Sequence, residues 1–420
     1  MAKLNTITGI DIGTSKVRTI IAQKPEAEDQ KPQIIGIGEA NTFGMRKGLV
    51  VDIEETANSI NESVEQAERM AGIPVEKAYV SIGSHDINCQ ISKGAIAIGR
   101  ADGEVTADDI ARVNNAAQAI SLPNNKEIIH VIPRFYNLDS QKNIKDPIGM
   151  NGVRLEVESL VIQGSTPHIK NIHKCLDRAG ISVEELVLSP LASQIATLTK
   201  RQRELGVVLI NIGGGTTGIA VYEESELMHM AIIPIGGNNI TNDIAIGLRT
   251  SIEVAEEIKI KYGSCLPNEI SKKEQVDLSK FDKNEESVAS RKHIAEIVEA
   301  RMEEIFEHVI KELKTIDRDG MLPAGAVIVG GSSKIRGCVD LAKEILKLPT
   351  QTGFPREMGG IVDKVDEPGF ITAVGLIYWG LESNNSLHSS SLSIPGVGQV
   401  SQSVADSVSK IKNWLKEFLP

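Results

Sequence analysis

Short apolar runs rich in valine and isoleucine alternate with amphipathic stretches along the first part of this chain. Strands are predicted where these runs have the length and β-branched content typical of sheets, at 4–12, 17–22, 33–40 and 78–83. A helix is predicted over 54–71, and Gly72 and Pro74 stop it. This alternation of strands and helices indicates an α/β fold.

The segment 206–222 predicts a β-hairpin with a glycine-rich tip. Its apolar run Val207–Ile212 leads into three consecutive glycines and two threonines, and a second apolar run, Ile219–Tyr222, follows. Glycine lets the backbone approach a ligand closely, so such a tip can present N–H groups to an anion. The glycine spacing also satisfies the dinucleotide fingerprint. That fingerprint requires a helix after the glycines, and here a strand follows, so the hairpin is favoured.

The same arrangement occurs at the N-terminus, where the tip 13–16 separates two strands. Asp11 and Asn211 each come at the end of the strand that leads into a tip. One Gly/Thr tip is usually a plain turn, but two of them suggest a duplicated fold that closes on one phosphate chain from both sides. A third glycine site, 326–337, has the pattern of a strand, a glycine pair and a helix.

The pattern changes between about 84 and 162. A strand pair is predicted over 88–98, and a helix over 106–120 is opened by Thr106 with Asp109 in its first turn. Further strands are predicted at 128–136 and 153–162. We interpret this stretch as an inserted α+β subdomain. The histidines in and after it, His85, His130, His168 and His173, have no metal-ligand spacing, so packing roles are favoured.

Helical patterns dominate the second half of the chain. Helices are predicted at 167–179, 190–200, from 238 onwards, at 293–316 and at 371–380, with a strand at 230–235. The sequence 250–253 predicts a capping box that opens a further helix ending at Gly263. The charged stretch 271–286 is expected to be a solvated loop.

Composition restricts the class of protein. With 41% hydrophobic and 24% charged residues and no long apolar run, the chain has the composition of a soluble protein of two or more lobes. Its beginning has no apolar secretion core. The net charge of −11 argues against nucleic-acid binding. The four cysteines form no Cys-x-x-Cys, so reduced thiols are expected rather than disulfides or a zinc site.

The C-terminal segment differs from the rest. Residues 383–403 are rich in Ser, Asn, Gly and Gln, which is typical of a flexible linker. In 404–420, apolar residues recur at helical spacing beside lysines, and 408–420 carries three lysines and one glutamate, a net charge of +2. The residues of this predicted membrane-surface helix are Val408, Lys410, Ile411, Lys412, Trp414, Leu415, Lys416 and Phe418. An ordinary amphipathic segment would be expected to dock on its own domain. The long linker before this segment argues against such docking and favours a membrane-surface helix.

A helix this short is marginal in water, so one tail should bind a membrane weakly. An array of tails should bind well through effective concentration. The segment therefore predicts a protein that works as an oligomer on a membrane.

Taken together, these motifs resemble the actin-like superfamily, which includes actin, MreB and DnaK-type chaperones, and within it the FtsA family of bacterial cell-division proteins. The resemblance runs over essentially the whole length. It is carried by Ile-Asp-Ile-Gly-Thr-Ser-Lys, Ile-Gly-Gly-Gly-Thr, Asp-Ile-Ala after Gly-Gly-Asn, Val-Gly-Gly-Ser-Ser-Lys-Ile, His-Val-Ile-Pro, Gly-Val-Arg and the terminal Lys-Ile-Lys-Asn-Trp-Leu-Lys-Glu-Phe.

The resemblance implies a two-lobed actin-like fold, a duplicated ribonuclease-H-like arrangement. The expected divisions are 1–83 with 163–204 (first lobe), 84–162 (inserted subdomain), 205–248 with 321–382 (second lobe), 249–320 (its upper, partner-binding subdomain), 383–403 (linker) and 404–420 (membrane helix).

The resemblance also implies that ATP and Mg²⁺ lie between the lobes. Asp11 would lie near the metal, with Asn211 reaching it through water. The residues implied to contact nucleotide are Asp11, Gly13, Thr14, Ser15, Lys16, Asn211, Gly213, Gly214, Gly215, Thr216, Thr217, Gly236, Gly237, Glu256, Lys259, Gly330, Gly331 and Ser332. Among them, Glu256 and Lys259 match the Glu-x-x-Lys that holds ribose and adenine.

Two positions depart from the hydrolysing members of the superfamily. Those members place an aspartate where this chain has Asn211, and a Glu or Gln near Ser189. Asparagine holds Mg²⁺-bound water less strongly than a carboxylate, and serine orients an attacking water poorly. We therefore expect ATP to be bound tightly and hydrolysed slowly or not at all.

The same resemblance implies partners and a location. The C-terminal peptide of the tubulin-like protein FtsZ would dock on 251–320, where Arg301 and Glu304 match family positions. The protein would form filaments with itself and meet other division proteins on the cytoplasmic face of the cell inner membrane, at the division septum.

Two other functions compete with the scaffold. A sugar kinase shares the phosphate hairpins but needs a general-base aspartate that cannot be placed in this chain, and a membrane tail is foreign to it. A chaperone ATPase needs a separate substrate domain after the second lobe, where only a short linker and tail remain.

Overall fold

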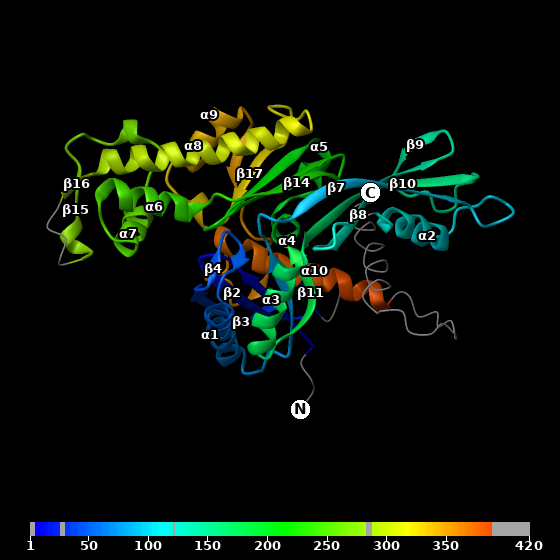
Figure 1. The fold of residues 1–420 in the computed structure, drawn as a ribbon, viewed down its shortest axis with the longest axis horizontal. Coiled ribbons are helices and arrows are strands. Elements are labelled where there is room, and N and C mark those ends of the chain that lie inside the picture. Colours follow the sequence, from blue (N-terminus) through cyan, green and yellow to red (C-terminus); the bar gives the residue numbers. More distant parts are fainter. Residues whose placement is uncertain (1–4, 26–29, 121, 283–287, 389–420) are drawn as a thin grey trace.

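The computed structural model describes residues 5–25, 30–120, 122–282 and 288–388 and folds them into two lobes with an inserted subdomain (Figure 1). The predicted membrane helix at 404–420 and residues 389–403 of the predicted linker lie outside the described residues. The linker prediction is wrong for residues 383–388, which continue helix α10 (Ile371–His388). In Figure 1 the inserted subdomain extends to one side of the molecule, and the helices α6 (Gly237–Leu248), α7 (Ile252–Tyr262) and α8 (Arg291–Thr315) extend to the other.

The first lobe is built on a sheet with the strand order β11-β6-β1-β2-β3, extended at its edge by β19. The strands are β1 (Thr6–Ile12), β2 (Lys16–Gln23), β3 (Gln33–Asn41), β6 (Lys77–Ile82), β11 (Ser182–Leu188) and β19 (Gly359–Gly360). Helices α1 (Ile53–Ala71) and α10 (Ile371–His388) pack against this sheet, and α3 (Thr166–Arg178) packs against α1. Gly72 closes α1 in the left-handed conformation, as its position after the helix predicts.

The second lobe repeats the order of the first. Its sheet runs β14-β13-β12-β17-β18, with β14 (Glu226–Ile233), β13 (Thr217–Glu223), β12 (Val207–Ile212), β17 (Gly325–Val329) and β18 (Thr350–Thr352). In both sheets an antiparallel three-stranded meander continues into two parallel strands. This repeat confirms the duplicated fold that the two hairpins predicted.

The two faces of the second sheet belong to different cores. Val207 and Leu209 face α4 (Ser189–Thr197) and the core of the first lobe, whereas Val208 and Ile210 face the core under α6 to α9. Alternate residues of a strand point to opposite faces, so an apolar run is buried on both sides. Helix α4 therefore ties the lobes together, and a short helix, α5 (Lys200–Leu205), follows it.

The inserted subdomain is a four-stranded sheet, β7-β10-β8-β9, with α2 (Ala107–Gln118) packed on it. Thr106 and Asp109 form the capping box that opens α2. The strands are β7 (Asn88–Ala97), β8 (Lys126–Leu138), β9 (Gln141–Ile144) and β10 (Arg154–Ser165). The prediction of a strand pair over 88–98 is wrong, because β7 is one strand paired along β10. Within this strand Gly94 lets α2 pass close, because a Cβ there would lie 2.6 Å from the Ala117 nitrogen.

The upper part of the second lobe contains α6 (Gly237–Leu248), α7 (Ile252–Tyr262) and α8 (Arg291–Thr315), which pack on one another. The prediction of a capping box at 250–253 is wrong, because Thr250 is not the N-cap of α7. Arg249 takes a left-handed conformation and the Thr250 N–H donates to Ala245 O, so both residues close α6. Ser251 is then the N-cap of α7.

Two further differences concern the second half of the chain. Part of 271–286 is not a plain loop, because β15 (Gln275–Asp277) pairs with β16 (Val288–Ser290) and buries Val276. At the third glycine site a 3₁₀ turn, η3 (Gly331–Lys334), comes between β17 and α9 (Cys338–Leu346).

Candidate nucleotide cleft

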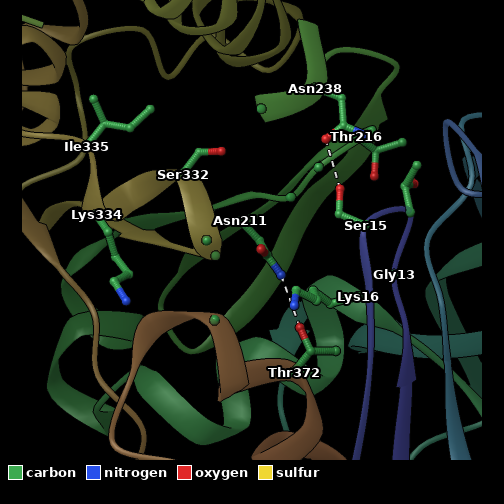
Figure 2. A pocket seen from close by; sticks show the side chains of 18 of the residues that line it. Gly13, Ser15, Lys16, Asn211, Thr216, Asn238, Ser332, Lys334, Ile335 and Thr372 are labelled. Atoms are coloured by element: carbon green, nitrogen blue, oxygen red, sulfur yellow. Dashed lines mark hydrogen bonds between the residues drawn. The ribbon is translucent and has the colours of Figure 1, made fainter. Parts of the chain in front are cut away.

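A cavity of about 620 Å³ lies between the lobes, where both glycine tips, α7 and η3 converge (Figure 2). Its volume is in the usual range for small-molecule sites. The residues predicted to contact nucleotide are brought together here from distant parts of the sequence. All of them line the cavity except Thr217 and Gly236.

The first tip is a tight turn between β1 and β2. The Gly13 N–H donates to Lys16 O at 3.0 Å, and a Cβ at Gly13 would lie 2.8 Å from that oxygen. The hydroxyl of Thr14 accepts a hydrogen bond from the Gly48 N–H at 3.0 Å. The tip is thus closed on itself and fastened to the segment that precedes α1.

The second tip repeats this geometry between β12 and β13. The Gly213 N–H donates to Thr216 O at 2.9 Å. Gly214 and Gly215 face the first tip: a Cβ at Gly214 would overlap the Ser15 hydroxyl, and a Cβ at Gly215 would lie 2.6 Å from Thr14 Oγ1. The consecutive glycines therefore let the two tips approach each other, which side chains larger than hydrogen would prevent.

The start of α6 joins both tips. The N–H groups of Gly237 and Asn238 donate to Gly213 O and Gly214 O at 2.8 and 2.7 Å. The Asn238 side chain also accepts a hydrogen bond from the Ser15 hydroxyl at 2.8 Å, drawn as a dashed line in Figure 2. Because Ser15 belongs to the first lobe and Asn238 to the second, this bond links the lobes directly.

Thr217 and Gly236 lie behind the lining. The Thr217 hydroxyl donates to Ile235 O, and Gly236 packs so closely that a Cβ there would meet the carbonyl oxygens of Gly213 and Gly214. Both residues therefore support the second tip from behind the residues that line the cavity.

Asp11 provides a buried carboxyl group at the end of β1. Its side chain is 9% exposed and accepts a hydrogen bond from the Ser81 hydroxyl at 2.7 Å. Burial raises the pKa of Asp11, whereas the Ser81 hydrogen bond and the positive charge of Arg18 oppose that rise. A carboxylate that loses solvation in this way is stabilised by a cation beside it.

Asn211 lies at the equivalent position of β12. Its side-chain nitrogen donates to Ser193 Oγ at 3.0 Å and to Thr372 Oγ1 at 3.2 Å. A carboxylate and an amide are oxygen donors of the kind that Mg²⁺ prefers, directly or through water. The donor set thus fits a divalent cation held by Asp11 and, through water, by Asn211. The described residues contain no group of three or more His, Cys, Asp and Glu side chains able to hold a metal without such help.

Glu256 and Lys259 lie one turn apart on α7 and face the cavity. The Lys259 ammonium, in a side chain only 10% exposed, donates to Glu256 at 2.6 Å, Thr241 at 2.8 Å and the Gly237 carbonyl at 3.2 Å. The carboxylate and ammonium form a polar pair suited to hydroxyl and ring-nitrogen groups of a ligand.

The third glycine site forms the remaining wall. Gly330 has a φ of +88°, which glycine adopts without strain, and it places η3 against the cavity. The Ser332 hydroxyl occupies the space that a Cβ at Gly237 would need, whereas a Cβ at Gly331 would have no neighbour within 4 Å. The cavity therefore has open space for a ligand next to Gly331.

Several lining residues were missed by sequence reasoning. Arg18 follows Lys16 by two positions on β2, so both face the same side, and this alternation is the signal that was available. Asn238 directly follows Gly236 and Gly237, which were predicted, so its neighbours were the signal available. Thr372 comes from a segment with no glycine tip, and its place in the site depends on how the lobes pack, which no local pattern encodes.

A second groove, of about 390 Å³, lies between α6 and α8. Arg301 and Glu304 line it, as do Asp243 and the exposed Ile246. The Arg301 guanidinium is held by Asp243, with nitrogen–oxygen distances of 2.6 and 3.0 Å, and also contacts Glu304. The two residues predicted to bind a partner thus share one apolar and charged groove.

The fold, with two repeated sheets around an interlobe cleft, defines the class of the protein as actin-like. Solved structures with this arrangement include a PilM-PilN type IV pilus biogenesis complex (TM-score 0.65, 15% identity, covering 90% of this chain and 98% of that chain) and MreB5 of Spiroplasma citri bound to ADP (TM-score 0.54, 12% identity, covering 92% and 99%). At these identities the likeness concerns the fold alone.

Comparison of sequences identifies the family. The family model "Cell division protein FtsA" matches residues 208–375, and the model "SHS2 domain inserted in FTSA" matches 83–163. The chain is 38% identical to the cell division protein FtsA of Pseudomonas aeruginosa (98% of this chain, 97% of the relative), 40% to that of Bacillus subtilis (88% and 82%) and 33% to that of Escherichia coli K12 (98% and 98%). This chain belongs to the FtsA family of cell division proteins.

Membership of this family favours the cell-division interpretation over the sugar kinase and the chaperone ATPase. Among the described residues, no helix is long and apolar enough to span a lipid bilayer.

The contact between the tips can be tested with two glycines. In Gly214→Ala the new methyl group should push the Ser15 side chain away and break its bond to Asn238, at a cost of about 1 kcal/mol in the free energy of unfolding. Hydrogen exchange of residues 13–16 should become faster. The matched control is Gly331→Ala, where the methyl group enters open space. Equal exchange rates at 13–16 in both variants would contradict the proposed contact.

Proposed function

We propose that this protein binds ATP with Mg²⁺ in the interlobe cleft and uses the bound state to assemble on the membrane as a division scaffold. The observation that carries the proposal is the convergence of both glycine tips with the Lys259–Glu256 pair on one cavity. Backbone N–H groups of the tips suit phosphate oxygens, and α7 suits the ribose and base. The superfamily to which the fold belongs generally binds nucleotide with a divalent metal.

Asp11 would hold the metal from the first lobe, with Asn211 reaching it through water, and the bound Mg²⁺ would offset the charge of the phosphates. Ser189, which lines the cavity, offers a hydroxyl and no carboxylate or amide for orienting a water. We therefore infer that hydrolysis is slow or absent, so that ATP acts mainly as a clamp between the lobes.

Nucleotide binding can be measured by titration calorimetry with Mg-ATP. Lys259→Met removes an ammonium group that is held at 2.6 Å from Glu256, and it should weaken ATP binding by about tenfold or more. Lys343→Met, on the exposed side of α9, is the matched control and should bind like the wild type. Unchanged affinity in Lys259→Met would contradict the assignment of the cleft, and turnover of ATP many times per minute would contradict slow hydrolysis.

The groove between α6 and α8 is the surface that we propose for a peptide partner, the C-terminal segment of FtsZ. Apolar contacts to Ile246 and Ile297 would hold the peptide, and Arg301 would orient one of its carboxylates. Because Arg301 is already paired with Asp243 and Glu304, a bound carboxylate must share or replace these partners.

Arg301→Ala should reduce the affinity for an FtsZ C-terminal peptide by about tenfold, since the loss of the guanidinium leaves Asp243 and Glu304 to repel acidic residues. Fluorescence anisotropy with a labelled peptide measures the effect. Lys311→Ala, exposed on the same helix, should bind as the wild type does. Equal losses in both variants would indicate a general charge effect and count against the groove.

Residues 404–420 would anchor the protein to lipid. Their support comes from the sequence, where Trp414, Leu415 and Phe418 recur at helical spacing beside lysines. Because one short helix binds weakly, filaments of the protein would bind more firmly than single molecules. This arrangement would hold FtsZ filaments and other division proteins at the cytoplasmic face of the inner membrane, at the septum.

Co-sedimentation with vesicles of phosphatidylglycerol and phosphatidylcholine tests the anchor. Deletion of 404–420 should abolish binding, and Trp414→Ala should reduce it several-fold, because a large apolar side chain contributes at most about 1.5–3 kcal/mol on burial. Adding Mg-ATP should increase binding of the intact chain only. A deleted form that sediments with vesicles as well as the intact chain does would overturn the anchor.

A further inference from the structure

Asn211 is held by a small hydrogen-bond network behind the cleft. Its side-chain nitrogen donates to Ser193 Oγ on α4 at 3.0 Å and to Thr372 Oγ1 on α10 at 3.2 Å; Figure 2 draws the second of these bonds. The two hydroxyl oxygens are themselves 3.0 Å apart. Ser193 is fully buried and Thr372 is 5% exposed, so water competes little with these bonds.

The network has a direction. The Ser193 hydroxyl donates its proton to the carbonyl of Ser189, one turn earlier on α4, at 2.8 Å. Ser193 can therefore only accept from Asn211 and Thr372, because a hydroxyl has a single proton. Thr372 donates to Ser193 and accepts from Asn211. The Asn211 nitrogen therefore donates toward both hydroxyls, and every hydroxyl proton has an acceptor.

This direction fixes which end of the amide faces the ligand. With the nitrogen bound to the two hydroxyls, the Asn211 oxygen lies on the side of Gly330, where a Cβ would be 2.6 Å from it, and Gly330 lines the cavity. The reverse orientation would point the amide oxygen at the lone pairs of Ser193. The side of Asn211 that faces the cleft at Gly330 is thus its amide oxygen, a hydrogen-bond acceptor.

We propose that Ser193 and Thr372 are positioning residues that make Asn211 select a hydrated divalent cation over a bare phosphate oxygen. An amide oxygen accepts hydrogen bonds from metal-bound water, whereas it repels a phosphate oxygen. An amide nitrogen turned into the cleft would do the opposite. The inference rests on the proposed binding of ATP. It adds Ser193 and Thr372 to the residues of the site, although neither lies in a glycine motif.

The test compares ATP affinity with Mg²⁺ and with EDTA. In the double variant Ser193→Ala, Thr372→Val, the amide is free to turn and donate to a phosphate oxygen. The ratio of the two affinities should then fall about tenfold, as expected for one hydrogen bond to a charged group. Thr372→Ser keeps the hydroxyl and should keep the ratio. A merely structural role would weaken both affinities alike, so an unchanged ratio in the double variant overturns the proposal.

A second measurement needs no ligand. In the full chain labelled with ¹⁵N-asparagine, the side-chain amide protons of Asn211 should exchange with solvent much more slowly than those of the exposed Asn58, and the double variant should remove this protection. Fast exchange in the wild type overturns the proposal. Slow exchange in a wild type that binds no ATP would overturn the proposed function while supporting the fixed orientation of Asn211.

Discussion

The close approach of the two glycine tips is the constraint on which the cleft depends. Gly214 and Gly215 touch the side chains of Ser15 and Thr14 so closely that neither position has room for a methyl group. At this contact the first lobe contributes the hydroxyl side chains of Thr14 and Ser15, and the second lobe contributes glycine backbone. The hydrogen bond from Ser15 to Asn238 joins the two lobes. Glycine is needed here for steric reasons as well as for ligand contact, so the same residues set the spacing of the lobes and the shape of the site.

Helix α4 explains how this spacing is kept. It packs against β12 and β13 of the second sheet and against α10, which lies on the first sheet. At Gly375 the helices α4 and α10 approach so closely that a Cβ would overlap the carbonyl oxygen of Ala192. Ser193 and Thr372 come from these two helices, and both accept a hydrogen bond from Asn211. The helix packing between the lobes is therefore directly connected to a residue that lines the cleft.

The sequence predicted the duplicated sheets and both tips, because apolar β-branched runs and consecutive glycines are local signals. It predicted Arg301 and Glu304 only through the family resemblance, and the groove that contains them needs α6 as well. Local patterns failed at 88–98, where a strand pair was predicted: β7 is one unbroken strand, and its Gly94 makes room for α2. They also missed Asn238 and Thr372, whose roles depend on contacts across 223 and 161 positions of the chain.

The charges of the cleft give a reason why the metal and the nucleotide should bind together. Six of the seven Lys and Arg residues that line it contact a carboxylate: Lys16 and Arg18 contact Glu39, Lys334 contacts Glu367, Lys259 contacts Glu256, Arg291 contacts Glu274 and Arg336 contacts Glu269. The seventh, Lys261, lies against the rings of Tyr262 and Phe281. A triphosphate entering alone would meet these carboxylates and the buried Asp11 and would have to compete with a carboxylate for six of the cations. A divalent cation would remove part of that repulsion at Asp11, where burial disfavours the negative charge and raises the pKa. For the ATP binding proposed above, the paired charges of the walls would thus favour a metal–nucleotide complex over the free nucleotide.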